Sequence, residues 1–227
     1  MERFKLSPCG RWMGLVGSPR KGGGYINVLD AGTCQWVAEV RVEGKGGVAD
    51  FEWWGDGEGM VVLGKGGEAV EWDGRKKRVV ARWTDEGAVG TTVVALGGRS
   101  AGLKELGGDR WLAVGSSSGI VNVYDRMQWG GAEGIPERVK PVRAFNQLTT
   151  PVSHLHFSPE GQVLCMASRW KRDALRLVHL PSCTVYRNWP TSSTPLGRIT
   201  AVAWSPNGEM LTVGNEQGKV RLWEIRS

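Results

Sequence analysis

The chain has 227 residues, of which 41% are hydrophobic and 23% charged, and its formal net charge is +6. This apolar fraction is typical of a globular chain and excludes a disordered one. The sequence contains no run of about 18 apolar residues, so no transmembrane helix is predicted. The 34 glycines and 12 tryptophans favour an all-β fold with many turns. Four cysteines without a C-x-x-C spacing indicate free thiols in a reducing compartment. The positive charge favours anionic partners only modestly, because many soluble proteins carry a charge of this size.

Taken in chain order, the sequence repeats one unit five times. The first two units are each predicted to hold four short strands, because apolar and polar residues alternate with a period of two between short turns. The third and fourth units follow the same order, and the stretch VKPVRAFNQL provides the fourth strand of the third. The last unit has three strands and no fourth. We place the units at residues 1–43, 44–87, 88–148, 149–197 and 198–227.

Turn chemistry supports this register. The turn between the first and second strands contains Pro or Gly, which favour tight turns, in four of the units, as SPCG (7–10), WGDG (54–57), SPEG (158–161) and SPNG (205–208). The third strands end near Asp30, Asp73, Asp125, Leu180 and Glu224. Two of these steps are close to the repeat length of about 40–45 residues that is typical of WD40 propeller blades. The two longer steps contain visible insertions at 97–108 and 127–141.

The last unit, RITAVAWSPNGEMLTVGNEQGKVRLWEIR, resembles the first three strands of a WD40 blade. We therefore predict an all-β, WD40-type β-propeller with about five blades in one propeller region. Val114 and Val213 stand where such blades often have Ser or Thr, so we expect packing between blades, and not the usual polar tetrad, to stabilise the fold. Trp72, Trp204 and Trp223 are the predicted core aromatics.

We expect these blades to be an incomplete part of a seven-bladed ring. The last unit lacks the outer strand, and Met1 falls inside the first strand of the first unit, so no segment of the sequence is left to supply the missing strand. The exposed sheet edges and apolar faces of such a fragment would favour aggregation.

Two passages resemble a narrower family. They are DRWLAVGSSSGIVNVYD (109–125) and residues 148–225, which include the distinctive MASRWKRDALRLVHLPS. Both are similar to the U3 small nucleolar RNA-associated protein 18 family, whose members are WD40 subunits of the small-subunit processome, and the matching passages are read as part of its C-terminal propeller. The resemblance implies a non-catalytic scaffold in the nucleolus that serves pre-rRNA processing and small ribosomal subunit assembly. It also implies a long N-terminal extension outside this chain.

The same resemblance implies the partners. They are other WD40 subunits of the processome, together with U3 snoRNA or pre-rRNA, which the chain contacts directly or through the complex. No cofactor, membrane or small-molecule substrate is expected. The alternative is a WD40 adaptor in an unrelated complex, such as a ubiquitin-ligase substrate receptor that reads a peptide on its central-channel face.

Catalytic and metal-binding motifs are weak. Residues 115–119 fit G-x-S-x-G, the motif of the nucleophile elbow of hydrolases. That elbow needs a helix directly after the serine, and here a strand of alternating apolar and polar residues follows. His154 and His156 share one face of a strand, yet no further ligands with matching spacing complete a zinc site. We therefore predict no enzyme activity, no catalytic or cofactor-binding residues and no bound metal.

Basic loops are the candidate contact residues. In a meander, the turns after the second and fourth strands lie on one face of a propeller, and this face carries a modest excess of cations. The loop 168–173 has an aromatic side chain among three cations, a combination that can stack on a base or anchor a protein interface. Solvated surface charge is the alternative for each of these residues. The predicted contacts are Arg169, Trp170, Lys171, Arg172, Arg20 and Lys21.

Overall fold

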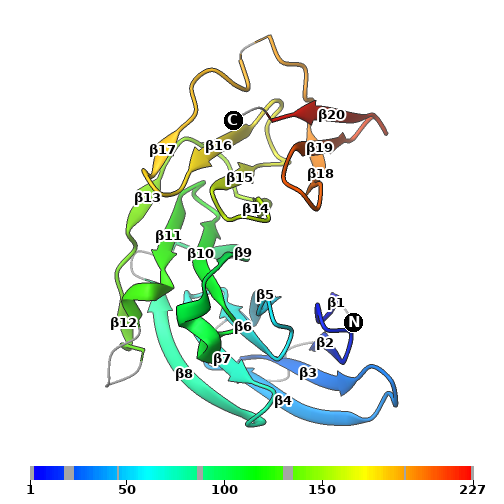
Figure 1. Cartoon of the computed structure of the whole chain (residues 1–227), viewed down its shortest axis with the longest axis vertical. Coiled ribbons are helices and arrows are strands. Elements are labelled where there is room, and N and C mark those ends of the chain that lie inside the picture. The colour runs from blue at the N-terminus through cyan, green and yellow to red at the C-terminus, as the bar shows by residue number, and fades with distance from the viewer. Residues whose placement is uncertain are drawn as a thin grey trace.

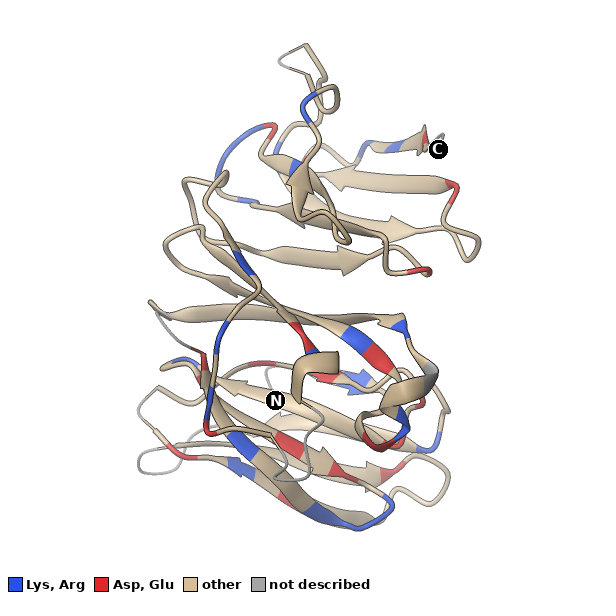
Figure 2. Cartoon of the chain, turned by 60° about the vertical axis from the view of Figure 1, so that its left-hand side comes forward, with Lys and Arg blue, Asp and Glu red and all other residues tan. Residues whose placement is uncertain are grey.

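The computed structural model describes residues 3–17, 23–44, 46–85, 89–129, 135–191 and 193–225. Five sheets follow one another along the chain and form an open arc (Figure 1). Seen from the side, the sheets stack face to face (Figure 2). The prediction of an all-β propeller, present as part of a ring, is confirmed. In the described part of the chain, no helix has the length and apolar character needed to cross a membrane.

The strands have the following bounds. The first sheet contains β1 (Phe4–Leu6), β2 (Trp12–Gly17), β3 (Gly24–Asp30) and β4 (Trp36–Val42). The second contains β5 (Val48–Trp53), β6 (Gly59–Gly64), β7 (Glu68–Asp73), β8 (Arg78–Asp85) and β12 (Arg138–Val139). The third contains β9 (Thr91–Arg99), β10 (Asp109–Ser116), β11 (Val121–Asp125) and β13 (Arg143–Phe145). The fourth contains β14 (His154–Phe157), β15 (Val163–Ala167), β16 (Leu175–His179) and β17 (Thr184–Val185), and the fifth β18 (Ile199–Trp204), β19 (Met210–Asn215) and β20 (Val220–Glu224).

Each sheet runs outward from the axis of the arc. The first strand of each sheet lies innermost, and β4, β8, β13 and β17 lie towards the rim (Figure 1). Two short 3-10 helices, η1 (Ala101–Leu106) and η2 (Arg126–Trp129), lie in the two insertions of the third unit. The arc stays open between the fifth sheet and the first (Figure 1).

The repeated turn owes its shape to local hydrogen bonds. At Ser7, Ser158 and Ser205, the hydroxyl accepts the N–H of the residue five positions later, at 2.9–3.1 Å. The glycine three positions after each serine donates its N–H to the serine carbonyl at 2.8–3.0 Å and has a φ between 70° and 77°. Glycine reaches this left-handed region without the steric cost of a Cβ, so these four-residue sequences specify the turn locally.

One connection differs from the prediction. The third sheet does receive its fourth strand from 143–145, but the chain first crosses to the second sheet, where β12 pairs in parallel with β8. The N–H of Thr84 donates to the carbonyl of Glu137 at 2.9 Å, and Val139 is buried beside Trp83 and Trp129. The insertion therefore ties the second sheet to the third.

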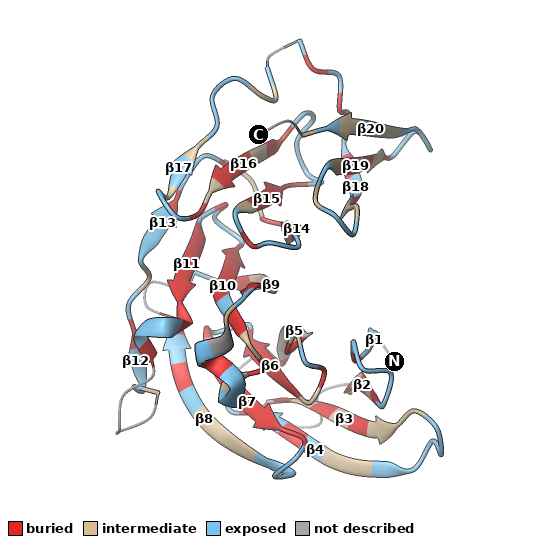
Figure 3. Ribbon diagram, viewed as in Figure 1, coloured by how far each residue is buried: buried red, intermediate tan, exposed pale blue. Residues whose placement is uncertain are grey.

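Apolar packing between neighbouring sheets forms the core (Figure 3). Trp12 and Trp72 meet edge to face between the first two sheets, with ring centroids 6.4 Å apart. Trp72 is buried as predicted, whereas Trp204 and Trp223 are only half-buried. Both pack against the apolar cluster between the fourth and fifth sheets, and, among the strands described, the fifth sheet has no further sheet beyond it.

The ends of the arc carry exposed apolar side chains. On β1, Phe4 and Leu6 are 59% and 56% exposed, and on β20, Val220 and Leu222 are 70% and 60% exposed. Sheets inside the arc bury the equivalent faces against a neighbour. Exposed apolar faces of this kind are normally covered in a complete propeller, so they fit part of a ring.

A buried ion pair joins the second sheet to the third. The Arg126 guanidinium contacts both Glu71 oxygens at 3.1 and 3.2 Å, and both side chains are 0% exposed. Glu71 also accepts the indole N–H of Trp54 at 2.8 Å, and Arg126 donates to the carbonyl of Leu106 at 2.9 Å. Burial raises the pKa of Glu71, and the charge of Arg126 opposes that rise. The pair thus fixes η1 and η2 against β7.

Three further acids link neighbouring sheets. The Asp50 carboxylate on β5 contacts Arg3 at 2.6 Å, and its other oxygen accepts the N–H of Val94 on β9 at 3.2 Å. Asp85 accepts hydrogen bonds from Asn122 and Tyr124 of the third sheet. Asp109 accepts the N–H of Gly55 at 2.6 Å. These carboxylates fix the sheets at positions where no backbone ladder connects them.

We predict that Glu71→Ala destabilises the protein by about 3–5 kcal/mol, because the substitution leaves the Arg126 charge buried without a counterion. Urea unfolding followed by tryptophan fluorescence measures this loss. In the double variant Glu71→Met, Arg126→Met, no charge remains buried, and we expect much of the stability to return. A double variant as unstable as Glu71→Ala would contradict this account of the pair.

A second prediction concerns pH. Burial raises the pKa of Asp109 to about 6, against the opposing effects of the Gly55 N–H and the Arg126 charge. Between pH 4 and pH 6, the folded state therefore holds a proton that the unfolded state releases, so this group costs stability as pH rises through that window. Asp109→Asn keeps the acceptor for Gly55 and removes the titration.

The stability of the unsubstituted protein, measured relative to Asp109→Asn, should fall by about 2 kcal/mol from pH 4 to pH 6. Urea unfolding at a series of pH values gives this difference, and other titrating groups cancel between the two proteins. Parallel stability curves for the two proteins would show that Asp109 does not titrate in this window.

Candidate functional site

The loop 168–173 connects β15 to β16 in the fourth sheet and begins at a buried anchor. The Ser168 side chain is fully buried, and its hydroxyl donates to the carbonyl of Pro151 at 2.7 Å. It also lies 2.7 Å from the Thr150 hydroxyl and accepts the N–H of Trp170 at 3.3 Å. These bonds hold the start of the loop against the connection that precedes β14.

The end of the loop is held by Asp173. Its carboxylate accepts the N–H groups of Leu196 and Gly197 at 2.8 and 2.7 Å, and its own N–H donates to the carbonyl of Gly197 at 2.8 Å. The backbone of Asp173 has a φ of 56°, in the left-handed region that short polar residues tolerate best after glycine. The carboxylate is therefore engaged with the connection to the fifth sheet.

Between these anchors the loop presents its basic and aromatic side chains to solvent. Trp170 is 62% exposed, and the guanidinium carbon of Arg169 lies 5.6 Å from its ring centroid. Lys171 Nζ donates to the Thr149 hydroxyl at 3.2 Å. Over the described ranges, none of Arg169, Lys171 and Arg172 forms an ion pair with a carboxylate. The structure brings these predicted residues together on one rigidly anchored loop.

Arg20 and Lys21 lie outside the described residues. The predicted contact role of all six residues, including the loop, stays a prediction.

The two histidines of β14 lie side by side near the axis. Their rings stack with centroids 6.5 Å apart, and His154 Nε2 is 3.0 Å from the carbonyl of Thr200. Burial lowers the pKa of both, that of His156 to about 4, so both are neutral at pH 7. Among the residues that can be described, no group of three or more His, Cys, Asp or Glu is placed to hold a metal ion.

Sequence reasoning missed a charged cluster on the inner strands. Lys5 of β1 contacts Glu52 at 2.7 Å and Asp50 at 3.3 Å, and its ammonium also donates to the carbonyl of Phe51. The signal was available, because Asp50 and Glu52 are two positions apart and so share one face of an otherwise apolar strand. These ion pairs join the first two sheets. Because the charges neutralise one another, the cluster offers little free charge to a ligand.

The segment between 115 and 119 is a hairpin turn. β10 ends at Ser116, β11 begins at Val121, and the two strands pair antiparallel. The Ser116 hydroxyl bonds to Ser118 and to the backbone of Ile120 at 2.8–3.1 Å. The G-x-S-x-G match is therefore a turn and has none of the strand-to-helix geometry of a nucleophile elbow.

Comparison with known proteins supports this architecture. The family described as WD domain, G-beta repeat matches residues 189–224. U3 small nucleolar RNA-associated protein 18 of Saccharomyces cerevisiae is 46% identical in an alignment of 216 residues that covers 89% of this chain and 35% of that protein. The probable counterpart in Schizosaccharomyces pombe is 41% identical over 99% of this chain and 40% of that protein, and the homolog in Homo sapiens is 29% identical over 99% and 37%.

The chain thus spans between 35% and 40% of the length of these curated relatives. Similarity over 89–99% of the chain agrees with the passages that carry the resemblance in the sequence. The chain is a WD40-repeat protein that resembles the U3 small nucleolar RNA-associated protein 18 family.

Proposed function

We propose that this chain is the propeller part of a non-catalytic scaffold subunit, in a nucleolar complex that processes pre-rRNA and assembles the small ribosomal subunit. The observation that carries this proposal is the similarity of almost the whole chain to proteins named as U3 small nucleolar RNA-associated. The WD40 repeat supports a scaffold, because propellers present loops from a rigid framework for binding partners.

The proposed partners are other WD40 subunits of the processome and U3 snoRNA or pre-rRNA, contacted directly or through the complex. The loop 168–173 is the proposed contact. Because Ser168 and Asp173 fix both its ends, binding would require little further ordering of the backbone, and this lowers the entropic cost of association. Trp and Arg are also the side chains that most often dominate interface energies.

We predict that changing Arg169, Trp170, Lys171 and Arg172 together to Ser reduces recovery of partner proteins and RNA by at least about tenfold, the loss that follows from removing one energetic hot spot. The measurement is affinity purification of the tagged full-length protein from cells, with quantification of pre-rRNA and co-purifying propellers. Ser168 and Asp173 are left unchanged, so the loop keeps its anchors.

A matched control removes two cations from the turn after β7 and one from the first position of β8. Lys76→Ser, Lys77→Asn and Arg78→Ser remove the same number of positive charges, and Asn tolerates the φ of 51° at position 77. This control should recover normal amounts of partners and RNA. Normal recovery with the loop variant, given intact folding, would show that the loop is solvated surface.

The same purification tests the alternative function. Recovery of a cullin-type partner in place of pre-rRNA and other propellers would overturn the proposed scaffold function. It would favour a substrate receptor that reads a peptide on its channel face.

A further inference from the structure

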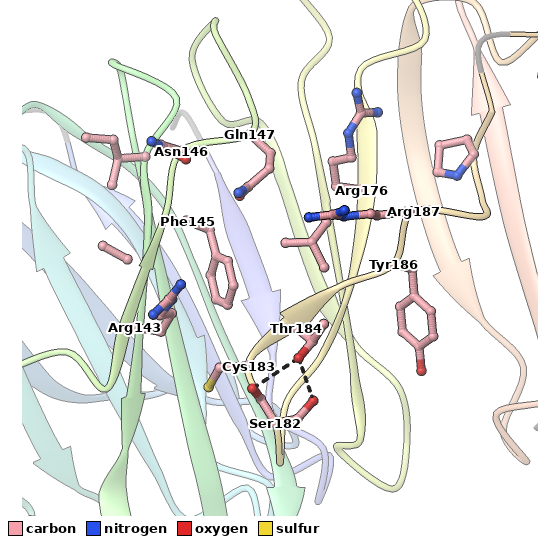
Figure 4. A pocket seen from close by; sticks show the side chains of 14 residues that line it. Arg143, Phe145, Asn146, Gln147, Arg176, Ser182, Cys183, Thr184, Tyr186 and Arg187 are labelled. Atoms are coloured by element: carbon pink, nitrogen blue, oxygen red, sulfur yellow. Dashed lines mark hydrogen bonds between the residues drawn. The ribbon is translucent and has the colours of Figure 1, made fainter.

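A groove of about 1000 Å³ runs along the rim of the arc between the third and fourth sheets (Figure 4). One wall consists of β13 and the residues after it, with Arg143, Phe145 and Gln147. The other wall consists of β16, β17 and the residues after β17, with Arg176, Tyr186 and Arg187. In the close view, Arg187 extends towards Gln147, and Arg143 lies on the β13 side of the groove (Figure 4).

The groove is basic. Its lining contains three arginines and no acidic residue. Across the described residues, none of the three guanidinium groups forms an ion pair. Asp125 is an acid close enough to act electrostatically on Cys183 of the lining, but its carboxylate already forms an ion pair with Arg110 at 2.8 Å. Three uncompensated cations around one groove repel one another, and an anionic ligand would relieve that repulsion.

Two of the side chains that face this groove have fixed positions. Arg176 donates to the carbonyl of Leu175 at 2.6 Å, which holds its guanidinium against the sheet. Tyr186 meets the ring of His179 edge to face, with centroids 6.4 Å apart, and remains 37% exposed. The tyrosine therefore offers an exposed aromatic surface at the edge of the lining, and in the close view its ring points away from the Arg187 guanidinium (Figure 4).

The chemistry of the lining selects between two classes of anionic partner. An acidic peptide would gain most from adding a strand to a sheet edge, but β13 and β17 are only three and two residues long. Single-stranded nucleic acid needs cations for phosphates and an aromatic platform for a base, and side-chain amides suit its exposed base edges. Arg143, Arg187 and Tyr186 meet the first two needs, and the exposed amides of Asn146 and Gln147 meet the third.

We propose that this groove binds a short segment of single-stranded RNA directly. Arg143, Arg176 and Arg187 would contact phosphates, and Tyr186 would stack on a base. This inference rests on the proposed function, because it names the chain itself as a subunit that contacts RNA, at a surface separate from the loop 168–173.

The test is fluorescence anisotropy of a labelled twelve-nucleotide oligo-U RNA with purified full-length protein, at several salt concentrations. Arg143→Ser with Arg187→Ser should weaken binding at least about tenfold and reduce the magnitude of the salt slope by about 1.4, the contribution of two phosphate contacts on a single strand. Tyr186→Leu should weaken binding about tenfold through lost stacking, with an unchanged salt slope.

A matched control carries Arg138→Ser and Lys140→Ser, two cations of the same connection that do not line the groove. It should bind oligo-U RNA with nearly the affinity and salt slope of the unsubstituted protein. Equal losses in this control and in the groove variant would overturn the proposal, because they would indicate binding to general positive charge. Unchanged RNA binding by the groove variant would also overturn it, as would tighter binding of a poly-glutamate peptide than of RNA.

Affinity purification from cells separates this inference from the proposed function. A protein that recovers pre-rRNA and other propellers from cells, but binds no oligo-U RNA when purified, would overturn the groove proposal and leave the scaffold function standing. Failure to recover the complex would count against the scaffold function, whatever the purified protein binds.

Discussion

The fold depends on the burial of one sheet face against the next, because neighbouring blades share almost no backbone ladder. The buried pair of Glu71 and Arg126 is the most demanding contact of this kind, since both charges are fully removed from water. Such a pair gains little net stability over an apolar replacement, but it is costly to break. Its role is to fix how the second and third sheets meet, and with them the two insertions of the third unit.

The contacts between the first three sheets differ from those between the fourth and fifth sheets. The buried carboxylates of Asp50, Asp85 and Asp109 link the first three sheets through hydrogen bonds. The fourth and fifth sheets pack through a smaller apolar cluster, and the indole N–H of Trp204 donates to the carbonyl of His156 at 3.2 Å. In the same way, the indole N–H of Trp53 at the end of β5 donates to the carbonyl of Lys5 on β1 at 3.0 Å. The same hydrogen bond thus joins the innermost strands of two pairs of neighbouring sheets.

The fourth sheet carries both proposed contact surfaces. The loop 168–173 joins its second and third strands, whereas the groove lies along its outer strand at the rim. A long RNA or an extended protein could therefore be held at two separated points on one rigid blade. The two surfaces differ in chemistry, because the loop offers an exposed indole among exposed cations and the groove offers arginines around a concave wall.

The sequence by itself determined the turns, the strand alternation and the basic loop. Ser7, Ser158 and Ser205 with their glycines specify the repeated turn through bonds that span only five residues, and hence local chemistry was enough to predict these turns and the register of the repeat. Tertiary structure alone decided the pairing of Val139 with the second sheet, the union of Glu71 with Arg126, and the groove that places Arg143 opposite Arg187. It also decided that Trp223 stays half-buried. These features join residues distant in sequence, and burial depends on which sheet lies alongside, which no local pattern of residues encodes.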